Sequence, residues 1–249
     1  MTVDYNPAEN THTYAGAHAA LSVLFPDRKP ASLLDVGCGP GAWLRAAMDL
    51  GIQDAVGVDG LDLEAHRLFV PKSVIQVHDL ERPFDLGRMF DLALCLEVAE
   101  HLSTEAADGL VRSITSHANL VLFGAACPGQ PGQHHINCQW PAYWQSRFNE
   151  AGFACNDAAR WQIWDDERIE PWYRQNMFWA QRAPLLAGRE ARINSVFHPE
   201  MVSAIGFDDF IKQIEMGSES ISWYISTPLR ALNAKLLRCI LRVVEKRQR

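Results

Sequence analysis

The sequence predicts an α/β fold in which a doubly wound, mostly parallel sheet of seven strands is covered by helices on both faces. Two observations predict it. Short apolar runs stopped by glycine or aspartate alternate with longer segments of helical spacing along residues 13–182. The chemically distinctive residues also fall where the short runs end, and parallel sheets bind their ligands beyond the carboxyl ends of the strands.

Each element follows from its local pattern. Helical spacing predicts helices over residues 13–25, 42–50, 104 onward and 141–150. Pro26 and Gly51 are suited to ending the first two, Ser103 can cap the third, and Pro141 suits the first turn of the fourth. Short apolar runs predict strands over residues 32–36, 55–59, 74–78, 90–96, 119–126, 161–164 and 177–181.

The length of 249 residues allows one sizeable α/β domain with an appendage. We divide the chain into an N-terminal helical segment (1–29), a central domain (30–182) and a C-terminal helical extension (183–249). The six cysteines form no CxxC pair, and no apolar run approaches the ~18 residues of a membrane span. The first residues lack the basic and apolar regions of a signal peptide. We therefore expect a cytoplasmic protein without structural disulfides.

The net charge of −7 is unevenly distributed. Residues 228–249 carry seven Lys/Arg and one Glu, a net charge of +6, so the remaining residues carry −13. An acidic main domain argues against a nucleic-acid partner. The tail has an apolar stripe (Leu229, Leu232, Leu236, Ile240 and Val243) opposite a basic one (Lys235, Arg238, Arg242, Lys246 and Arg249). This pattern fits peripheral contact with the inner membrane face, or packing against the acidic domain or a second subunit.

A glycine-rich loop follows the first predicted strand, with Asp35 before it and Asp59 at the end of the next strand. Glycines let the backbone turn sharply and approach a ligand, and the following helix offers free N–H groups. The loop loosely fits a dinucleotide pattern, which leaves an NAD-dependent dehydrogenase as an alternative. Asp35 would repel a pyrophosphate, however, whereas it suits the cationic S-adenosylmethionine.

Four segments resemble motifs of the class I methyltransferase family, which has a Rossmann-like fold: residues 33–44, 56–59, 78–80 and 90–97. The resemblance covers roughly residues 30–182. It implies that Asp35 and the glycines face the methionine part of S-adenosylmethionine, Asp59 the ribose, and Asp79 with Leu80 the adenine. The candidate donor-binding residues are Asp35, Gly37, Cys38, Gly39, Gly41, Asp59, Gly60, Asp79, Leu80 and Glu97.

An acid–histidine cluster follows the fourth predicted strand, and three interpretations stay open. Glu97, Glu100, His101 and His135 could bind Mg²⁺, Mn²⁺ or Fe²⁺, which would activate an acceptor hydroxyl. A similar site occurs in small-RNA 2′-O-methyltransferases. Alternatively His135 or His134, beside Glu100, acts as a metal-free general base. In the third interpretation the carboxylates cap helices and His101 packs at the sheet edge.

The region from residue 127 to 176 is expected to select the acceptor. Its segments 128–144 and 172–176 resemble a bacterial subgroup of methyltransferases associated with surface-glycan assembly, which implies O-methylation of a sugar-containing or other small-molecule acceptor. Trp140 and Tyr143 could line its pocket, and Arg160 and Arg174 could contact it, although surface ion pairs are the expected role of these arginines. The alternatives are 2′-O-methylation of RNA and a non-catalytic S-adenosylmethionine-binding module. The oligomeric state is not predicted.

Overall fold

A computed structural model describes residues 14–202 and confirms the predicted α/β class. Seven strands form one sheet in the order β3-β2-β1-β4-β5-β7-β6. Strands β1 to β5 pair in parallel, and β7 runs antiparallel to both β5 and β6. The strands are β1 (Ser32–Val36), β2 (Asp54–Asp59), β3 (Ile75–Val77), β4 (Leu92–Leu96), β5 (Leu120–Gly124), β6 (Phe153–Asn156) and β7 (Phe178–Arg182).

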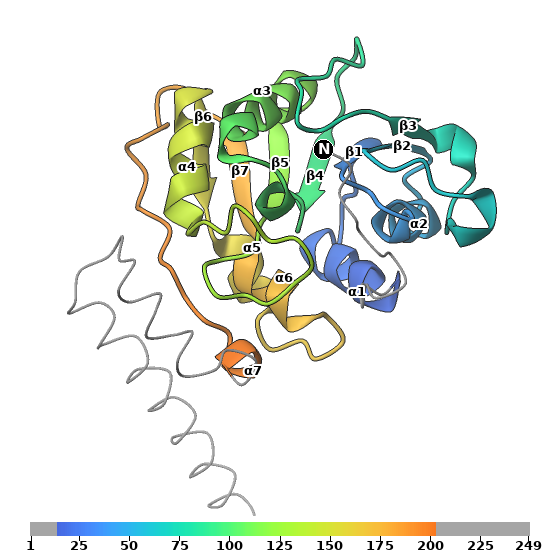
Figure 1. Cartoon of the computed structure of the whole chain (residues 1–249). Helices are drawn as coiled ribbons and strands as arrows, with labels where there is room; N and C mark the ends of the chain where they lie inside the picture. The colour runs from blue at the N-terminus through green and yellow to red at the C-terminus, as the bar shows by residue number, and fades with distance from the viewer. Residues whose placement is uncertain (1–13, 203–249) are drawn as a thin grey trace, which may run out of the picture.

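Helices cover both faces of the sheet, as Figure 1 shows. They are α1 (Tyr14–Leu24), α2 (Ala42–Asp49), α3 (Ala107–His117), α4 (Pro141–Glu150), α5 (Ala158–Ile163), α6 (Pro171–Asn176) and α7 (Pro199–Val202). Single 3₁₀ turns are η2 (Ala65–Arg67), η3 (Lys72–Val74), η4 (Ala99–His101) and η5 (Thr104–Ala106). Ser103 caps η5 by accepting a hydrogen bond from the Ala106 N–H. Within the described residues, no helix is long and apolar enough to cross a membrane.

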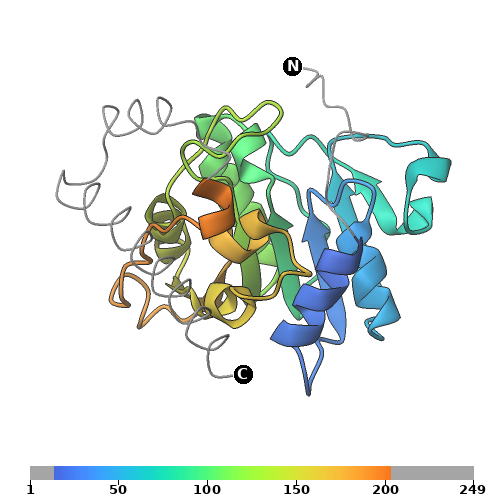
Figure 2. The same ribbon diagram turned by 90° about the horizontal axis from the view of Figure 1, so that it is seen from below.

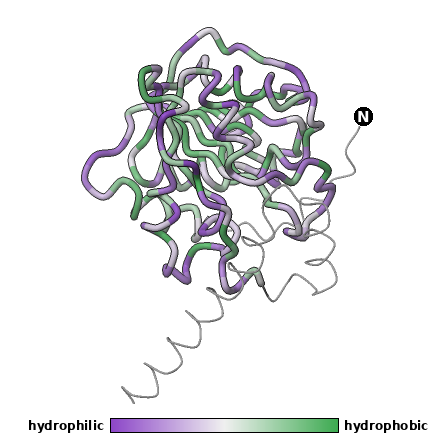
Figure 3. The backbone as a smooth tube through the Cα atoms, turned by 90° about the vertical axis from the view of Figure 1, so that its left-hand side faces the viewer, coloured by the Kyte–Doolittle hydropathy of each residue, from purple (hydrophilic) through white to green (hydrophobic). Residues whose placement is uncertain are grey.

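Two apolar clusters hold the layers together, one on each face of the sheet. Helices α3 and α4 pack on one face around the fully buried Phe123 and Phe148. Helices α1, α2 and α5 pack on the other around Leu21, Leu44 and Ile163. In Figure 3 the green colour that marks hydrophobic residues is concentrated toward the middle of the molecule. Burial of each such side chain stabilises the fold by about 1.5–3 kcal/mol.

One predicted strand is wrong. Residues 161–164 belong to α5 and the turn that follows it, and the strand lies earlier, in β6. Gly152, with a φ of 81°, ends the turn after α4, so the chain enters the sheet at once at Phe153. In α5 the buried residues are Ala159, Arg160 and Ile163, which is helical spacing. The other six strands start and end within two residues of their predicted bounds; in the third, the predicted first residue Val74 closes η3 and β3 begins at Ile75.

The chain beyond β7 returns across the domain. After an exposed turn at Leu185 and Leu186, residues 190–198 run past α4 and lead to α7, which lies beside α6 in Figure 2. Gln145 of α4 holds this segment by donating to the Ala191 carbonyl and accepting from the Ile193 N–H. The remainder of the predicted C-terminal extension, including the amphipathic segment 228–249, lies outside the described residues, as do residues 1–13 of the predicted N-terminal segment.

Candidate functional site

The glycine loop joins β1 to α2 at the carboxyl edge of the sheet. Gly37, Gly39 and Gly41 have φ values of 76°, 51° and 86°, a region that disfavours any residue with a Cβ. A Cβ on Gly37 would also lie 2.2 Å from a methyl group of Val98, whereas nothing lies within 4 Å of a Cβ built on Gly39. The loop is therefore packed against the protein on one side and open at Gly39.

Two buried carboxylates flank this loop. Asp35 is 3% exposed, and its Oδ2 has no hydrogen-bond partner among the described residues. Burial, together with the nearby Asp59, raises the pKa of Asp35 to about 8. Asp59 accepts hydrogen bonds from the N–H groups of Gly39 (2.7 Å) and Leu61 (2.8 Å), and burial still raises its pKa. A cationic ligand group would relieve the unfavourable burial of Asp35.

The remaining candidate donor-binding residues lie around the same edge. Leu80 and Cys38 are buried and pack into the apolar clusters. Gly60 directly follows β2. Asp79 is exposed, and its carboxylate accepts from the Glu81 N–H and pairs with Arg82 at 3.5 Å. The structure thus brings Asp35, Asp59 and the glycine loop together, with Asp79 at the solvent boundary.

Glu97 follows β4 with a φ of 57°, a strained backbone conformation for a residue with a side chain. Its buried carboxylate accepts hydrogen bonds from the side-chain amides of Gln130 (2.5 Å) and Asn176 (2.9 Å). The Asn176 amide also donates to the Gln130 Oε1 at 2.8 Å. Burial raises the pKa of Glu97 to about 7, and these two amides oppose the shift. Glu97 is thus held by residues from two other elements.

Gln130 and Asn176 were not among the residues expected to build this site. Gln130 lies in the loop after β5, and Asn176 is the last residue of α6. Amide side chains give no periodic or charged pattern, so their meeting at Glu97 follows only from the order of β5, β7 and β4 in the sheet. The paired aromatic and amide residues at 172–176 were the only available signal.

Three of the four predicted metal ligands gather beside Glu97. Each of Glu100, His101 and His135 offers a ligand atom within 4.8 Å of the others. Glu100 is fully buried, and neither of its carboxylate oxygens forms a hydrogen bond of ordinary geometry within the described residues. The Glu100 carbonyl accepts from the N–H groups of Ile136 and Asn137, which fixes the histidine loop against η4. Glu97, the fourth predicted ligand, is outside this group and accepts hydrogen bonds from the Gln130 and Asn176 amides.

The two imidazoles of this group are oriented by the backbone. The Nδ1 of His135 lies 3.0 Å from the Gln130 carbonyl, and its Nε2 lies 4.0 Å from Glu100. Burial lowers the pKa of His135, and burial with the neighbouring His135 lowers the pKa of His101 to about 4. Burial and the Glu97 charge raise the pKa of Glu100 well above its usual range. Both imidazoles are neutral at pH 7, and in His135 the contact of Nδ1 with a carbonyl makes that nitrogen the donor and Nε2 the acceptor.

His134 does not join the group. Its side chain is exposed, its backbone has a φ of 54°, and its carbonyl lies 3.4 Å from the Nδ1 of His101.

Comparison with known proteins identifies the family. The sequence profile of a family described as a methyltransferase domain matches residues 9–174, most of the chain. The chain belongs to this methyltransferase family.

Curated relatives of the methyltransferase match over short segments. A ribosomal RNA large subunit methyltransferase E from Caulobacter sp. is 46% identical over 37 residues, 15% of this chain. One from Hyphomonas neptunium is 32% identical over 71 residues, 28% of this chain. The matches span only 16% and 27% of the lengths of these relatives.

Solved structures share the fold at low identity. DesVI of Streptomyces venezuelae has a TM-score of 0.52 at 18% identity, covering 68% of this chain and 92% of that one. The sugar N-methyltransferase KedS8 from Streptoalloteichus sp. has a TM-score of 0.53 at 17% identity, covering 71% and 90%. These similarities establish the class I methyltransferase fold.

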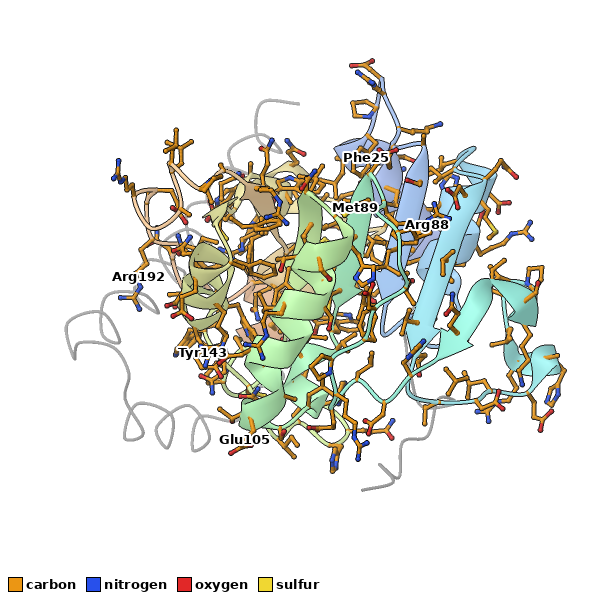
Figure 4. All side chains as sticks on the ribbon, turned by 90° about the horizontal axis from the view of Figure 1, so that it is seen from above. Phe25, Arg88, Met89, Glu105, Tyr143 and Arg192 are labelled. Carbon is orange, nitrogen blue, oxygen red and sulfur yellow. The ribbon has the colours of Figure 1, made fainter. Side chains whose placement is uncertain are left out.

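The region beyond β5 carries the predicted acceptor residues of the methyltransferase. Trp140 and Tyr143 line a surface hollow of about 480 Å³ between α4 and residues 188–192. In Figure 4 the labelled Tyr143 and Arg192 lie on this side, and Glu105 lies at the opposite end of the sheet from Phe25. Trp140 also packs edge-on against Phe197 at 5.5 Å.

The expected surface ion pairs of Arg160 and Arg174 are wrong. Arg160 is 0% exposed and Arg174 is 2% exposed. Arg174 pairs with Glu200 at 2.7 Å and donates to the Trp164 carbonyl, so α6 is tied to α7. The sequence concealed this burial because residues 190–200, which cover both arginines, carry no strong apolar pattern.

Proposed function

We propose that this methyltransferase transfers the methyl group of S-adenosylmethionine to a hydroxyl group of a sugar-containing or other small-molecule acceptor. One observation carries the proposal. The glycine loop after β1 and the group formed by Glu100, His101 and His135 after β4 and β5 lie at the same edge of the sheet. The donor loop follows β1 and the hydroxyl-activating group begins after the neighbouring β4. This arrangement brings donor and acceptor close together, as direct displacement requires.

The residues around the loop fit the donor. The unpartnered Oδ2 of the buried Asp35 suits the ammonium group of the methionine part, and the open space at Gly39 admits the ligand against backbone. Asp59 retains lone pairs for the ribose hydroxyls beyond the two N–H groups that it accepts. Leu80 with Asp79 would contact the adenine, and Cys38 and Gly60 complete the walls. Bound S-adenosylmethionine supplies an electrophilic methyl group.

A divalent cation also fits the residues present. Glu100 has two carboxylate oxygens without ordinary hydrogen bonds, and the His135 Nδ1 faces the Gln130 carbonyl, which leaves Nε2 for a metal. One carboxylate and two imidazoles suit Mn²⁺ or Fe²⁺, with Mg²⁺ a weaker match. Bound there, the cation would lower the pKa of an acceptor hydroxyl. Without it, neutral His135 can itself take the hydroxyl proton.

The test is methyl transfer by the full chain to sugars, an amino sugar and catechol-type hydroxyls, read as S-adenosylhomocysteine formed. We expect transfer to a hydroxyl and a kcat about 100-fold or more lower in His135→Asn, with unchanged S-adenosylhomocysteine affinity. His66→Asn, at an exposed position, is the matched control. Transfer only to the amino sugar, or equal kcat in His135→Asn, would contradict the proposal. Binding of donor without any turnover would indicate a non-catalytic module.

Manganese titration of the full chain separates the two roles of His135. If the cation acts, Glu100→Gln and His135→Asn both lose manganese binding measured by calorimetry, and EDTA abolishes turnover. If His135 is a metal-free base, EDTA leaves turnover unchanged.

A second candidate is 2′-O-methylation of RNA, favoured by the short matches to ribosomal RNA methyltransferases. The net charge of −7 opposes it, because phosphate contacts need many Lys and Arg side chains. RNA binding with a steep dependence on salt concentration would support this alternative.

A further inference from the structure

The buried guanidinium of Arg160 has two nitrogens without a hydrogen-bond acceptor among the described residues. Its guanidinium is 0% exposed, and its Nη1 donates to Asp157 at 3.3 Å and to the Asn194 carbonyl at 3.1 Å. Within residues 14–202, no acceptor reaches its Nε or Nη2. These two nitrogens form the side-on fork of the guanidinium, whose parallel N–H groups match the two oxygens of a carboxylate or phosphate.

Two other arginines of this chain show what fills such a fork. Arg45 directs Nε and Nη2 at the two oxygens of Asp49, each at 3.0 Å. Arg168 directs the same atoms at Asp166, at 2.8 and 2.6 Å. Both of these arginines are exposed, where water could satisfy the fork. At Arg160 the fork is buried, and leaving it empty carries a cost in free energy that the exposed sites would not have.

Arg160 also lies on the acceptor side of the candidate site. Strand β6 runs parallel to β5, since both are antiparallel to β7, so α5 begins at the edge where the loop after β5 begins. The Cys127 thiol at the start of that loop is within electrostatic range of both Arg160 and Glu97. Asn194, which contacts the guanidinium, belongs to the segment that returns after β7.

We propose that the Nε and Nη2 groups of Arg160 bind an oxyanion, a carboxylate or phosphate group, carried by the acceptor. The assignment of the oxyanion to the acceptor rests on the proposed function, whereas the oxyanion site itself does not. The acceptor class is then an acidic or phosphorylated hydroxyl compound rather than a neutral one. Entry of the anion requires the segment around Asn194 to move, because the guanidinium is 0% exposed.

The test measures binding rather than turnover. The full chain, with S-adenosylhomocysteine and EDTA at constant ionic strength, is titrated with inorganic phosphate, glucuronate, glucose 6-phosphate and glucose, and followed by calorimetry and thermal unfolding. We expect stabilisation by at least one anion and none by glucose. The affinity for that anion should be about tenfold to hundredfold weaker in Arg160→Met, with Arg160→Lys intermediate because an ammonium lacks the fork. Arg168→Met, at an exposed and filled fork, should bind as the wild type does.

The variants also report on folding. In anion-free buffer we expect Arg160→Met to change the melting temperature little, because loss of the contacts with Asp157 and the Asn194 carbonyl is offset by removal of a buried charge that lacks partners at two nitrogens. Equal effects of glucose and the anions, or unchanged anion affinity in Arg160→Met, would overturn the oxyanion site. If anion binding requires Arg160 but methyl transfer occurs only to an amino group, the oxyanion site is supported and the proposed transfer to a hydroxyl is wrong.

Discussion

Replacing Asp35 by asparagine tests the donor site most directly. The Asp35 carboxyl is buried, one oxygen has no partner, and its pKa is raised to about 8. If the donor's ammonium group binds the ionised form, S-adenosylhomocysteine affinity rises with pH. The ionised fraction is about 1% at pH 6 and about half at pH 8, so the affinity should rise about 50-fold.

The Asp35→Asn substitution should remove this dependence. An asparagine side chain keeps the shape of the aspartate but lacks its charge, so affinity at pH 8 should fall about tenfold to hundredfold and vary little with pH. Calorimetric titration between pH 6 and 8 measures both effects. Asp62→Asn, at an exposed carboxylate paired with Lys72, is the control and should retain the wild-type profile. A wild-type affinity independent of pH would refute the reasoning.

The ionisation of Asp35 also affects the free energy of unfolding of the donor-free protein, but in the opposite direction to donor affinity. The folded pKa of Asp35 lies above the ordinary value, so the folded protein holds a proton that the unfolded chain releases. The contribution of Asp35 to the free energy of unfolding therefore falls as pH rises from about 4 to about 8. Urea unfolding of the wild type and Asp35→Asn across this range isolates that contribution.

Two further predictions concern the neighbouring groups. Asn176→Leu removes the amide that donates to Glu97 and Gln130, so it should lower the free energy of unfolding in urea by about 2–4 kcal/mol. The control Gln76→Leu, at an exposed position, should change this free energy little. Gly132→Ala places a Cβ 2.1 Å from the His135 Nε2, so it should weaken manganese binding at least tenfold. The affinity for S-adenosylhomocysteine should not change. Manganese affinity equal to that of the wild type would contradict the position assigned to this imidazole.

The sequence predicted best what depends on local pattern. The position of Asp35 and the glycine loop followed from one strand and its end, and both β1 and α2 lie where expected. The clustering of Glu100 and His101 followed from adjacency in the chain. The predicted strand at 161–164 failed because two tryptophans around Gln162 and Ile163 suit a strand as well as a helix, and Arg160 beside them was read as exposed.

What the sequence could not supply was the meeting of distant segments. Glu97 was expected to act with Glu100, but Gln130 and Asn176 bind it, and they reach it from positions 33 and 79 residues away. Such contacts depend on strand order rather than on periodicity. The segment that returns after β7 escaped prediction for the same reason, because it is held by contacts with distant residues, such as the hydrogen bond of Gln145 with Ile193 and the packing of Phe197 against Trp140.

The position of β7 has a consequence for the order in which the chain can fold during synthesis. Strand β6 is made first, yet among residues 14–202 it pairs only with β7, which lies between it and β5. Until the ribosome has released residues up to Arg182, the nascent sheet ends at β5, with its edge open, and Phe153 and Cys155 have no strand beside them. The half of the sheet that carries the glycine loop can therefore assemble on the ribosome, whereas the half formed by β6 and β7 must wait for the last strand.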